Sequence, residues 1–301
     1  MHRFATLSLI TACAVLSACS KPTTAPDPAY LEEIEQWRQN RIERLTAPDG
    51  WLTLVGLHWL EPGDNVIGSS PSANVQLADR DIPDEIGNLI LEGRAVVFEP
   101  RPEHAILVNG VLADEPLHLR SDAAEGGPDM LTFGGLSLHI IARGERLGVR
   151  VKDPEASTRR SFPGIEHFPV DPTFRVTARL DAFDTPKWVA VSTAVGTEET
   201  LMCPGELHFS IHGRKLTLQP WIDEPGQTDL FIVFRDRTSG TTTYGAGRFL
   251  TAALEGDGTA VVDFNKAFSP PCAFTPFATC PLPPPENSLP IPITAGEKHQ
   301  H

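Results

Sequence analysis

The sequence lacks the short motifs that mark the common hydrolases, metalloproteases and nucleotide-binding enzymes. It contains no G-x-S-x-G nucleophile elbow, no H-E-x-x-H helix and no glycine-rich P-loop. Gly245-Ala246-Gly247 begins like a dinucleotide fingerprint, but the third glycine and the following helix are missing. The histidines weighed as metal ligands are too dispersed to form a site by spacing; they are His58, His139, His167 and His208. We therefore expect no cofactor and no metal, and the sequence leaves open whether the protein is an enzyme.

Positive charge is also scarce. The chain has 25 Lys and Arg residues against 39 Asp and Glu residues, for a formal net charge of -14. Proteins that bind nucleic acid need basic side chains to displace the counterions of the phosphates. We therefore expect no nucleic-acid partner. The same negative charge disfavours attachment to an anionic membrane surface through a basic patch.

The first segment carries the features of an export signal. Arg3 is followed by an apolar run from Phe4 to Leu16, which is too short to span a bilayer. Leu16-Ser17-Ala18-Cys19 resembles the lipobox of bacterial lipoproteins, in which the cysteine is acylated and becomes the first mature residue. The resemblance implies a signal peptide at 1–18, lipidation of Cys19 and a lipidated spacer at 19–29. We expect an exported protein held by this lipid, in the outer membrane and facing the periplasm.

Cysteine is rare as well, with five residues in the chain. Cys13 leaves with the signal peptide and Cys19 is consumed by acylation, so Cys203, Cys272 and Cys280 remain. In an oxidising periplasm we expect a disulfide between Cys272 and Cys280, worth roughly 2–3 kcal/mol, and a free Cys203. A zinc site is the weaker alternative, because zinc cysteines usually lie two to four residues apart.

The pattern of the mature chain predicts a mainly β protein. Asp27 and Pro28 suit a helix start, an apolar face follows, and Pro48-Asp49-Gly50 stops it, so we predict a helix over 30–50. Short apolar runs separated by turn residues then predict a β-sandwich over 51–152. A linker over 153–171 leads to a second antiparallel β domain over 172–298, a barrel or a sandwich. Its proline-rich segment 265–292 is predicted to be an ordered strap, because it also holds aromatic residues.

Two resemblances cover parts of the chain. The run from Asp263 to Asn287, with Trp51-Leu52, Gly56–Leu60 and Tyr244–Phe249, resembles the bacterial DUF1684 family over about residues 30 to 298. This family is one of unknown function, so the resemblance implies no catalytic residues.

The first β region, 51–152, more weakly resembles the forkhead-associated (FHA) sandwich, through Gly63–Ser70, Val75–Leu77 and Val108–Gly110. Ser69 stands where that fold uses an Arg to bind phosphothreonine, and the later Ser-x-x-His is absent. The resemblance therefore implies a scaffold and not the activity.

One polar constellation in the second domain is a candidate ligand site. It draws on adjacent hairpins and on the strap that covers them, and its members are Arg235, Tyr244, Arg248, Asp263, Asn265, Glu286 and Asn287. Arg248 beside Asp263 would position a substrate carboxylate or hold a general base. The alternative is a buried salt bridge that fixes the strap.

A basic stripe in this acidic chain is a second candidate, as an anion site or as solvated strand ends. Its members are Arg143, Arg146, Arg150, Arg159 and Arg160.

Three functions remain open from the sequence. The first is a lipid-anchored envelope protein that binds a small molecule or a partner protein through a cavity in its second β domain. The second is an envelope enzyme, of hydrolase type, that uses acid and base residues under the strap. The third is a purely structural interaction module, which would need an exposed apolar patch.

Overall fold

The computed structural model describes residues 26–77 and 82–299. The expected signal peptide 1–18, Cys19 and residues 20–25 of the spacer lie outside the described residues. Within the described ranges, no helix is both long and apolar enough to cross a bilayer.

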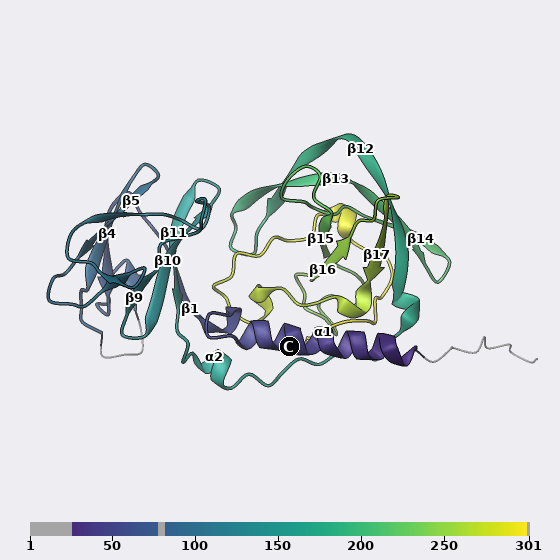
Figure 1. Ribbon diagram of the computed structural model, residues 1–301, viewed down its shortest axis with the longest axis horizontal. Coiled ribbons are helices and arrows are strands. Elements are labelled where there is room, and N and C mark those ends of the chain that lie inside the picture. The colour runs from purple at the N-terminus through teal and green to yellow at the C-terminus, as the bar shows by residue number, and fades with distance from the viewer. Residues whose placement is uncertain (1–25, 78–81, 300–301) are drawn as a thin grey trace, which may run out of the picture.

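The chain begins with α1, which spans Pro28–Thr46. The Asp27 side chain accepts a hydrogen bond from the backbone N–H of Ala29 at 3.1 Å, so the predicted cap is confirmed. The helix begins and ends earlier than the predicted range 30–50. Ile34 and Leu45 are fully buried, and α1 lies along the underside of the second domain (Figure 1).

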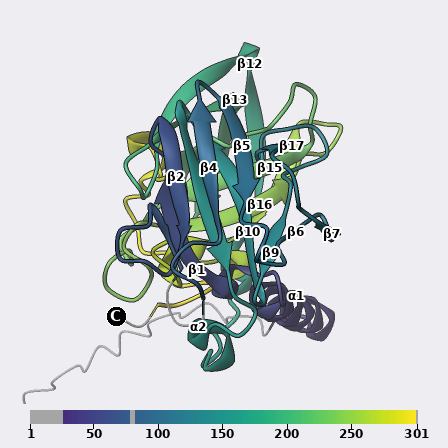
Figure 2. The same cartoon turned by 90° about the vertical axis from the view of Figure 1, so that its left-hand side faces the viewer.

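Two sheets form the first domain, and the predicted sandwich is confirmed. One sheet has the order β1-β11-β10-β9-β6-β7 and the other β3-β2-β4-β5-β8. Figure 2 shows β2, β4 and β5 of the second sheet side by side. The inner faces of the two sheets share a core that includes Ile67, Phe98, Ile140 and Val149. The strands are β1 Leu54–Trp59, β2 Gly63–Gly68, β3 Val75–Gln76, β4 Gly87–Glu92, β5 Ala95–Pro100, β6 Leu107–Val108, β7 Val111–Leu112, β8 Leu117–Leu119, β9 Leu131–Phe133, β10 Leu136–Arg143 and β11 Arg146–Lys152.

The outer face of the first sheet is basic. On β11, Val149 and Val151 belong to the sandwich core, so the alternation of a strand turns Arg150 and Lys152 to the other face. His139 of β10 stands opposite Arg150 in the antiparallel register. Strands β1, β10 and β11 are the part of this domain nearest to the second domain (Figure 1). The register therefore carries this basic face to the junction of the two domains.

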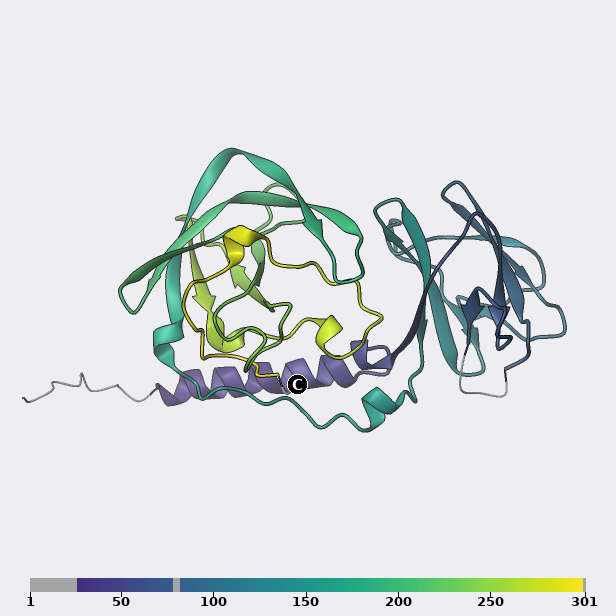
Figure 3. The ribbon, with the colours of Figure 1, turned by 180° about the vertical axis from the view of Figure 1, so that it is seen from behind.

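The linker contains a short helix, α2 at Ser157–Arg160, which the sequence did not predict. The Thr158 hydroxyl donates to the Leu52 carbonyl at 2.6 Å, and Arg159 donates to the Thr46 carbonyl at 2.7 Å. These contacts hold the linker beside the C-terminal end of α1 (Figure 3).

The second domain is built from two open antiparallel sheets, of order β14-β13-β12-β17 and β15-β16. The barrel alternative is therefore wrong, because the sheets do not close. The space between them is occupied by a core that includes Leu207, Phe234 and Phe264. The strands are β12 Arg175–Ser192, β13 Glu198–Ile211, β14 Arg214–Leu218, β15 Asp229–Phe234, β16 Arg248–Ala253 and β17 Thr259–Asp263. Short 3-10 turns lie at η1 Trp51–Thr53, η2 Pro172–Phe174, η3 Phe264–Lys266, η4 Pro271–Ala273 and η5 Pro285–Asn287.

The proline-rich segment 265–292 is an ordered strap across this domain, as predicted. Because proline has no backbone N–H, the strap donates backbone hydrogen bonds from its non-proline residues. Phe268 exchanges two backbone hydrogen bonds with Phe249, at 2.8 and 2.9 Å, and the Leu282 N–H donates to the Ser192 carbonyl at 2.8 Å. The Leu289 N–H donates to Arg235 in the same way at 2.8 Å.

The expected disulfide is wrong: Cys272 and Cys280 are both free thiols. The turn η4 places the backbone N–H of Cys272 3.2 Å from the sulfur of Cys280, which accepts it. The two residues are thus held together by hydrogen bonds and not by a covalent bond. Cys203 is free and buried.

Candidate functional site

The structure does not bring the seven predicted ligand residues together in one cleft. Arg248, at the start of β16, has a fully buried side chain that pairs with Asp236 at 2.9 Å and not with Asp263. It also donates to the Ile293 carbonyl at 2.9 Å and to the Ala295 carbonyl. Arg248 therefore holds the C-terminal segment in place. This is the alternative of a buried salt bridge, but the partner is Asp236 and not the expected Asp263.

Asp263 and Asn265 form a separate cluster that anchors α1. The Tyr30 hydroxyl lies 2.9 Å from each carboxylate oxygen of Asp263, and Asn265 Nδ2 lies 3.0 Å from the Tyr30 oxygen. Asn265 also donates to the Asp171 carbonyl at 2.9 Å. Burial and the neighbouring Asp263 raise the pKa of Tyr30. The cluster joins the helix, the linker and β17, and its side chains are hydrogen-bonded to one another.

The remaining candidates are scattered. Asn287 is buried and donates to the carbonyls of Gln219 at 2.9 Å and Val233 at 2.8 Å, while Glu286 is exposed. The Tyr244 hydroxyl donates to the Cys272 carbonyl at 2.9 Å. Arg235 is exposed and borders a pocket of about 370 Å³ beside the strap.

Larger pockets lie at the junction of the two domains. One, here called the interdomain pocket, has a volume of about 600 Å³ and is lined by residues that include Trp51, Arg143, Glu199, Leu201, Phe249 and Thr279. The other, the basic pocket, has about 560 Å³ and is lined by residues that include Arg41, Arg44, Trp51, Arg150, Lys152 and Phe268. Trp51 borders both pockets.

The position of Trp51 follows from the end of α1. A Cβ atom at Gly50 would lie 2.6 Å from the Leu45 carbonyl oxygen, so only glycine allows the chain to turn this sharply. The next turn, η1, begins at Trp51, and its Thr53 hydroxyl donates to the Gly50 carbonyl. The indole is thereby placed between the helix end and the basic face of β11.

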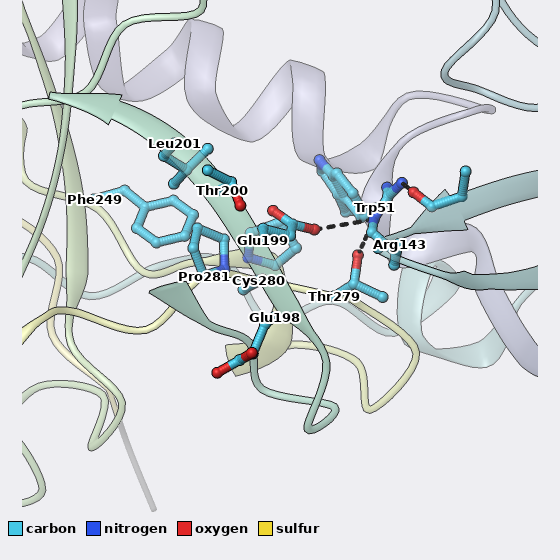
Figure 4. A pocket seen from close by; sticks show the side chains of 13 residues that line it. Trp51, Arg143, Glu198, Glu199, Thr200, Leu201, Phe249, Thr279, Cys280 and Pro281 are labelled. Atoms are coloured by element: carbon cyan, nitrogen blue, oxygen red, sulfur yellow. Dashed lines mark hydrogen bonds and ion pairs between the residues drawn. The ribbon is translucent and has the colours of Figure 1, made fainter. Parts of the chain in front are cut away.

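Opposite sides of the interdomain pocket differ in character (Figure 4). Leu201, Phe249 and Pro281 lie on one side, and Arg143 lies on the other with Trp51. Arg143 contacts Asp122 of its own domain at 2.8 Å and Glu199 of the second domain at 3.3 Å. Burial raises the pKa of Glu199.

Four cations line the basic pocket, and two of them have clear protein partners. Arg41 pairs with the fully buried Glu297 at 3.0 Å, and Lys152 Nζ donates to the Asp49 carbonyl at 2.7 Å. Within the part of the chain that the structure describes, Arg44 donates only to the Asn40 carbonyl of its own helix, at 3.3 Å. Burial lowers the pKa of Lys152.

Arg150 is the fourth cation of the basic pocket and the most unusual. The residue is 5% exposed, yet among the described residues no carboxylate lies within salt-bridge distance of it. One nitrogen donates to the Thr279 hydroxyl at 3.3 Å, the guanidinium carbon lies 5.2 Å from the Trp51 ring, and Nε has no partner. Burial and the nearby Arg143 lower the pKa of Arg150 to about 10. The more distant Asp122 and Glu199 oppose this lowering only in part, so an anion beside the guanidinium would stabilise its charge further.

Only some of the five arginines of the basic stripe line a pocket. Arg143, Arg146 and Arg150 line pockets at the junction, and Arg146 also stacks over Trp59 at 4.1 Å. Arg159 and Arg160 lie on α2. Sequence reasoning missed Trp51 and Arg41 as pocket residues. The signal that was available is the register of β11, which puts Arg150 and Lys152 on one face.

Comparison with known proteins finds one family. Residues 160–298 match the model of the family described as a protein of unknown function (DUF1684). No curated protein matches the chain.

Solved structures give partial matches. An uncharacterized protein from Haloarcula marismortui is 34% identical, with 46% of this chain and 78% of that chain covered and a TM-score of 0.39. The FhaA FHA domain complexed with the intracellular domain of Rv3910 is 15% identical, with 32% and 97% covered and a TM-score of 0.23. A structure described under phosphothreonine-dependent FHA domain interactions is 16% identical, with 33% and 96% covered and a TM-score of 0.22.

Proposed function

Because the chain belongs to the DUF1684 family through residues 160–298, and that family's description assigns no activity, we propose a function from the geometry of the junction. The protein is a lipid-anchored envelope protein that binds a small organic anion in the basic pocket between its two β domains. Arg150 is the charged anchor and Trp51 is the aromatic wall beside it.

This proposal rests on the burial of Arg150 and on the groups that surround its guanidinium. Its guanidinium is buried, residues 26–77 and 82–299 offer it no carboxylate within salt-bridge distance, and it lines a pocket of about 560 Å³. An anion in that pocket would supply the missing charge and accept hydrogen bonds from the planar fork. Arg41, Arg44 and Lys152 line the same pocket against one acidic lining residue, Asp49, so the local charge is positive although the chain as a whole is acidic.

This proposal moves the binding site away from the interior of the second domain. That interior is filled by buried side chains, so a ligand there would need to displace the core. The enzyme alternative is less favoured, because Arg248, Asp263 and Asn265 are each buried among protein partners. A general acid or base must reach its substrate.

Binding is tested by calorimetric titration with benzoate, octanoate and inorganic phosphate. Arg150→Gln should weaken binding of the organic anions at least tenfold, because the buried positive charge is removed. Arg179→Gln, which changes an exposed arginine on β12, is the matched control and should leave affinity unchanged. Equal affinity of the two variants, or no binding of any anion to the wild type, contradicts the proposal.

The anchor is tested separately. Cys19→Ala should abolish labelling with palmitate and release the protein from membranes, because the acylated thiol is lost. Unchanged membrane retention of this variant would rule out the anchor and leave the binding proposal standing.

A further inference from the structure

We propose that the anion is amphipathic and has a single charged head: a long-chain acid whose head binds Arg150 in the basic pocket and whose apolar chain passes Trp51 into the interdomain pocket. This inference rests on the proposed function and specifies the class of ligand. It follows from how the two pockets are joined and from the side chains at each end.

The two pockets are neighbours along the same structural elements. Trp51 borders both of them. On β16, Phe249 lines the interdomain pocket and Thr251 lines the basic pocket, and residues two apart in a strand share a face. Phe268 of the strap lines the basic pocket, and its ring centroid lies 5.8 Å from that of Phe249. The pockets therefore lie side by side at the junction of the domains, with Trp51 on their common border, and the proposal treats them as the two ends of one groove.

The interdomain end of the groove suits an apolar chain. Leu201, Phe249 and Pro281 lie together on one side of it (Figure 4). Each methylene group that leaves water for such a surface strengthens binding by about fourfold. An acid with a longer chain should therefore bind more tightly until the pocket is filled.

The basic end suits the head group. Arg150 presents its buried guanidinium there, and Lys152 and Arg44 add positive charge. Trp37 and Phe268 line the same end, so the first carbons of the chain also meet aromatic surface. A carboxylate or a phosphate monoester satisfies this chemistry, because both accept paired hydrogen bonds from a guanidinium.

A second charged group at the far end of the ligand is disfavoured. Glu198 and Glu199 both line the interdomain pocket. Glu199 already shares Arg143 with Asp122, so no free cation faces the chain at this end within the described residues. A dicarboxylate would bring a second negative charge against Glu199 in a half-buried site, where repulsion is poorly screened.

Calorimetric titration of the full chain tests the inference with octanoate, dodecanoate, dodecyl phosphate, dodecanedioate and dodecanol, below their micelle concentrations. Dodecanoate should bind up to about 250-fold more tightly than octanoate, from about fourfold for each of its four additional methylene groups, and at least tenfold more tightly than dodecanedioate or dodecanol. The relative affinities of dodecanoate and dodecyl phosphate show whether the head group is that of a free fatty acid or of a lipid-like phosphate. A stronger response to either one is consistent with the groove.

Variants separate this inference from the proposed function. Leu201→Asn should reduce the preference for dodecanoate over octanoate at least fivefold, whereas Leu112→Asn, at an exposed leucine of β7, should not change it. Thermal melting shows whether each variant is folded. If octanoate binds through Arg150 but neither a longer chain nor a second carboxylate changes the affinity, the proposal of an amphipathic ligand is wrong. The proposal of anion binding then stands. If no acid depends on Arg150, both proposals fall.

Discussion

Arg248 and Asp236 meet at 2.9 Å with both side chains wholly shielded from water. The same guanidinium donates to backbone carbonyls of the C-terminal segment, among them that of Ile293. Burial lowers the pKa of Arg248, and Asp236 opposes that effect. This pair therefore joins β16 to the C-terminal segment at residues 293–297.

Removal of one member of the pair should be severe. We expect Arg248→Met to lower the free energy of unfolding by about 3–5 kcal/mol, because the buried Asp236 loses its cationic partner and keeps only hydrogen bonds from Thr238 and Ile293. Arg235→Met, at an exposed position on the same edge, should change it by less than about 0.5 kcal/mol. Urea denaturation measures both. A loss below about 1 kcal/mol for Arg248→Met would show that the pair does not hold the segment.

Gly247, which precedes Arg248 in the chain, should not tolerate a side chain. Its φ is +103°, and a Cβ atom there would lie 2.5 Å from the Phe234 carbonyl oxygen. Gly247→Ala should destabilise the protein by at least about 1 kcal/mol. Gly256→Ala is the control, because nothing lies within 4 Å of its added atom. Similar melting temperatures for the two variants would contradict this account.

Acid should destabilise the first domain through His139. Burial lowers its pKa to about 4 in the folded protein, below its ordinary value of 6.5. The folded state therefore takes up this proton less readily than the unfolded chain, so stability present above pH 6.5 is lost as pH falls toward 4. The loss is at most about 3 kcal/mol.

A variant isolates this contribution from other groups that titrate in the same range. The free energy of unfolding of His139→Asn should depend less on pH between 6.5 and 4 than that of the wild type. His118→Asn, at an exposed histidine, should follow the wild type. Parallel curves for the wild type and His139→Asn would disprove the assignment.

The three described cysteines should differ in reactivity. The hydrogen bond from Cys280 lowers the pKa of the Cys272 thiol, and the same contact raises that of Cys280. Cys203 and Cys280 are buried, whereas Cys272 is partly exposed. Iodoacetamide should therefore modify Cys272 first in the native protein, as peptide mass mapping would show. A Cys272–Cys280 crosslink in protein never exposed to reductant would contradict the free thiols.

Local patterns in the sequence predicted the elements well. Asp27, Pro28 and the apolar face defined α1, and the alternation of strands such as β10 and β11 defined the sandwich. The ordered strap was predicted because Phe268 and its neighbours gave it something to bury. These features depend on residues close together in the chain.

The site was harder to predict, because it depends on contacts between distant segments. Arg248 lies on β16 and Asp263 on β17, which are consecutive strands of the second domain. Their partners, Asp236 and Tyr30, lie in different parts of the chain. The groove needs the end of α1, β11 and the strap to converge on Trp51. A basic stripe was visible in the sequence, but only the register and the domain arrangement show that Arg150 is buried without a carboxylate.

The central claim is that Arg150 binds the head of an organic anion at the domain junction. A crystal structure of the protein with dodecanoate tests it most directly. The account predicts that the carboxylate lies within hydrogen-bond distance of the Arg150 guanidinium and that the chain runs past Trp51 toward Leu201. A carboxylate bound elsewhere, with the Arg150 guanidinium still without an anion, would contradict the account.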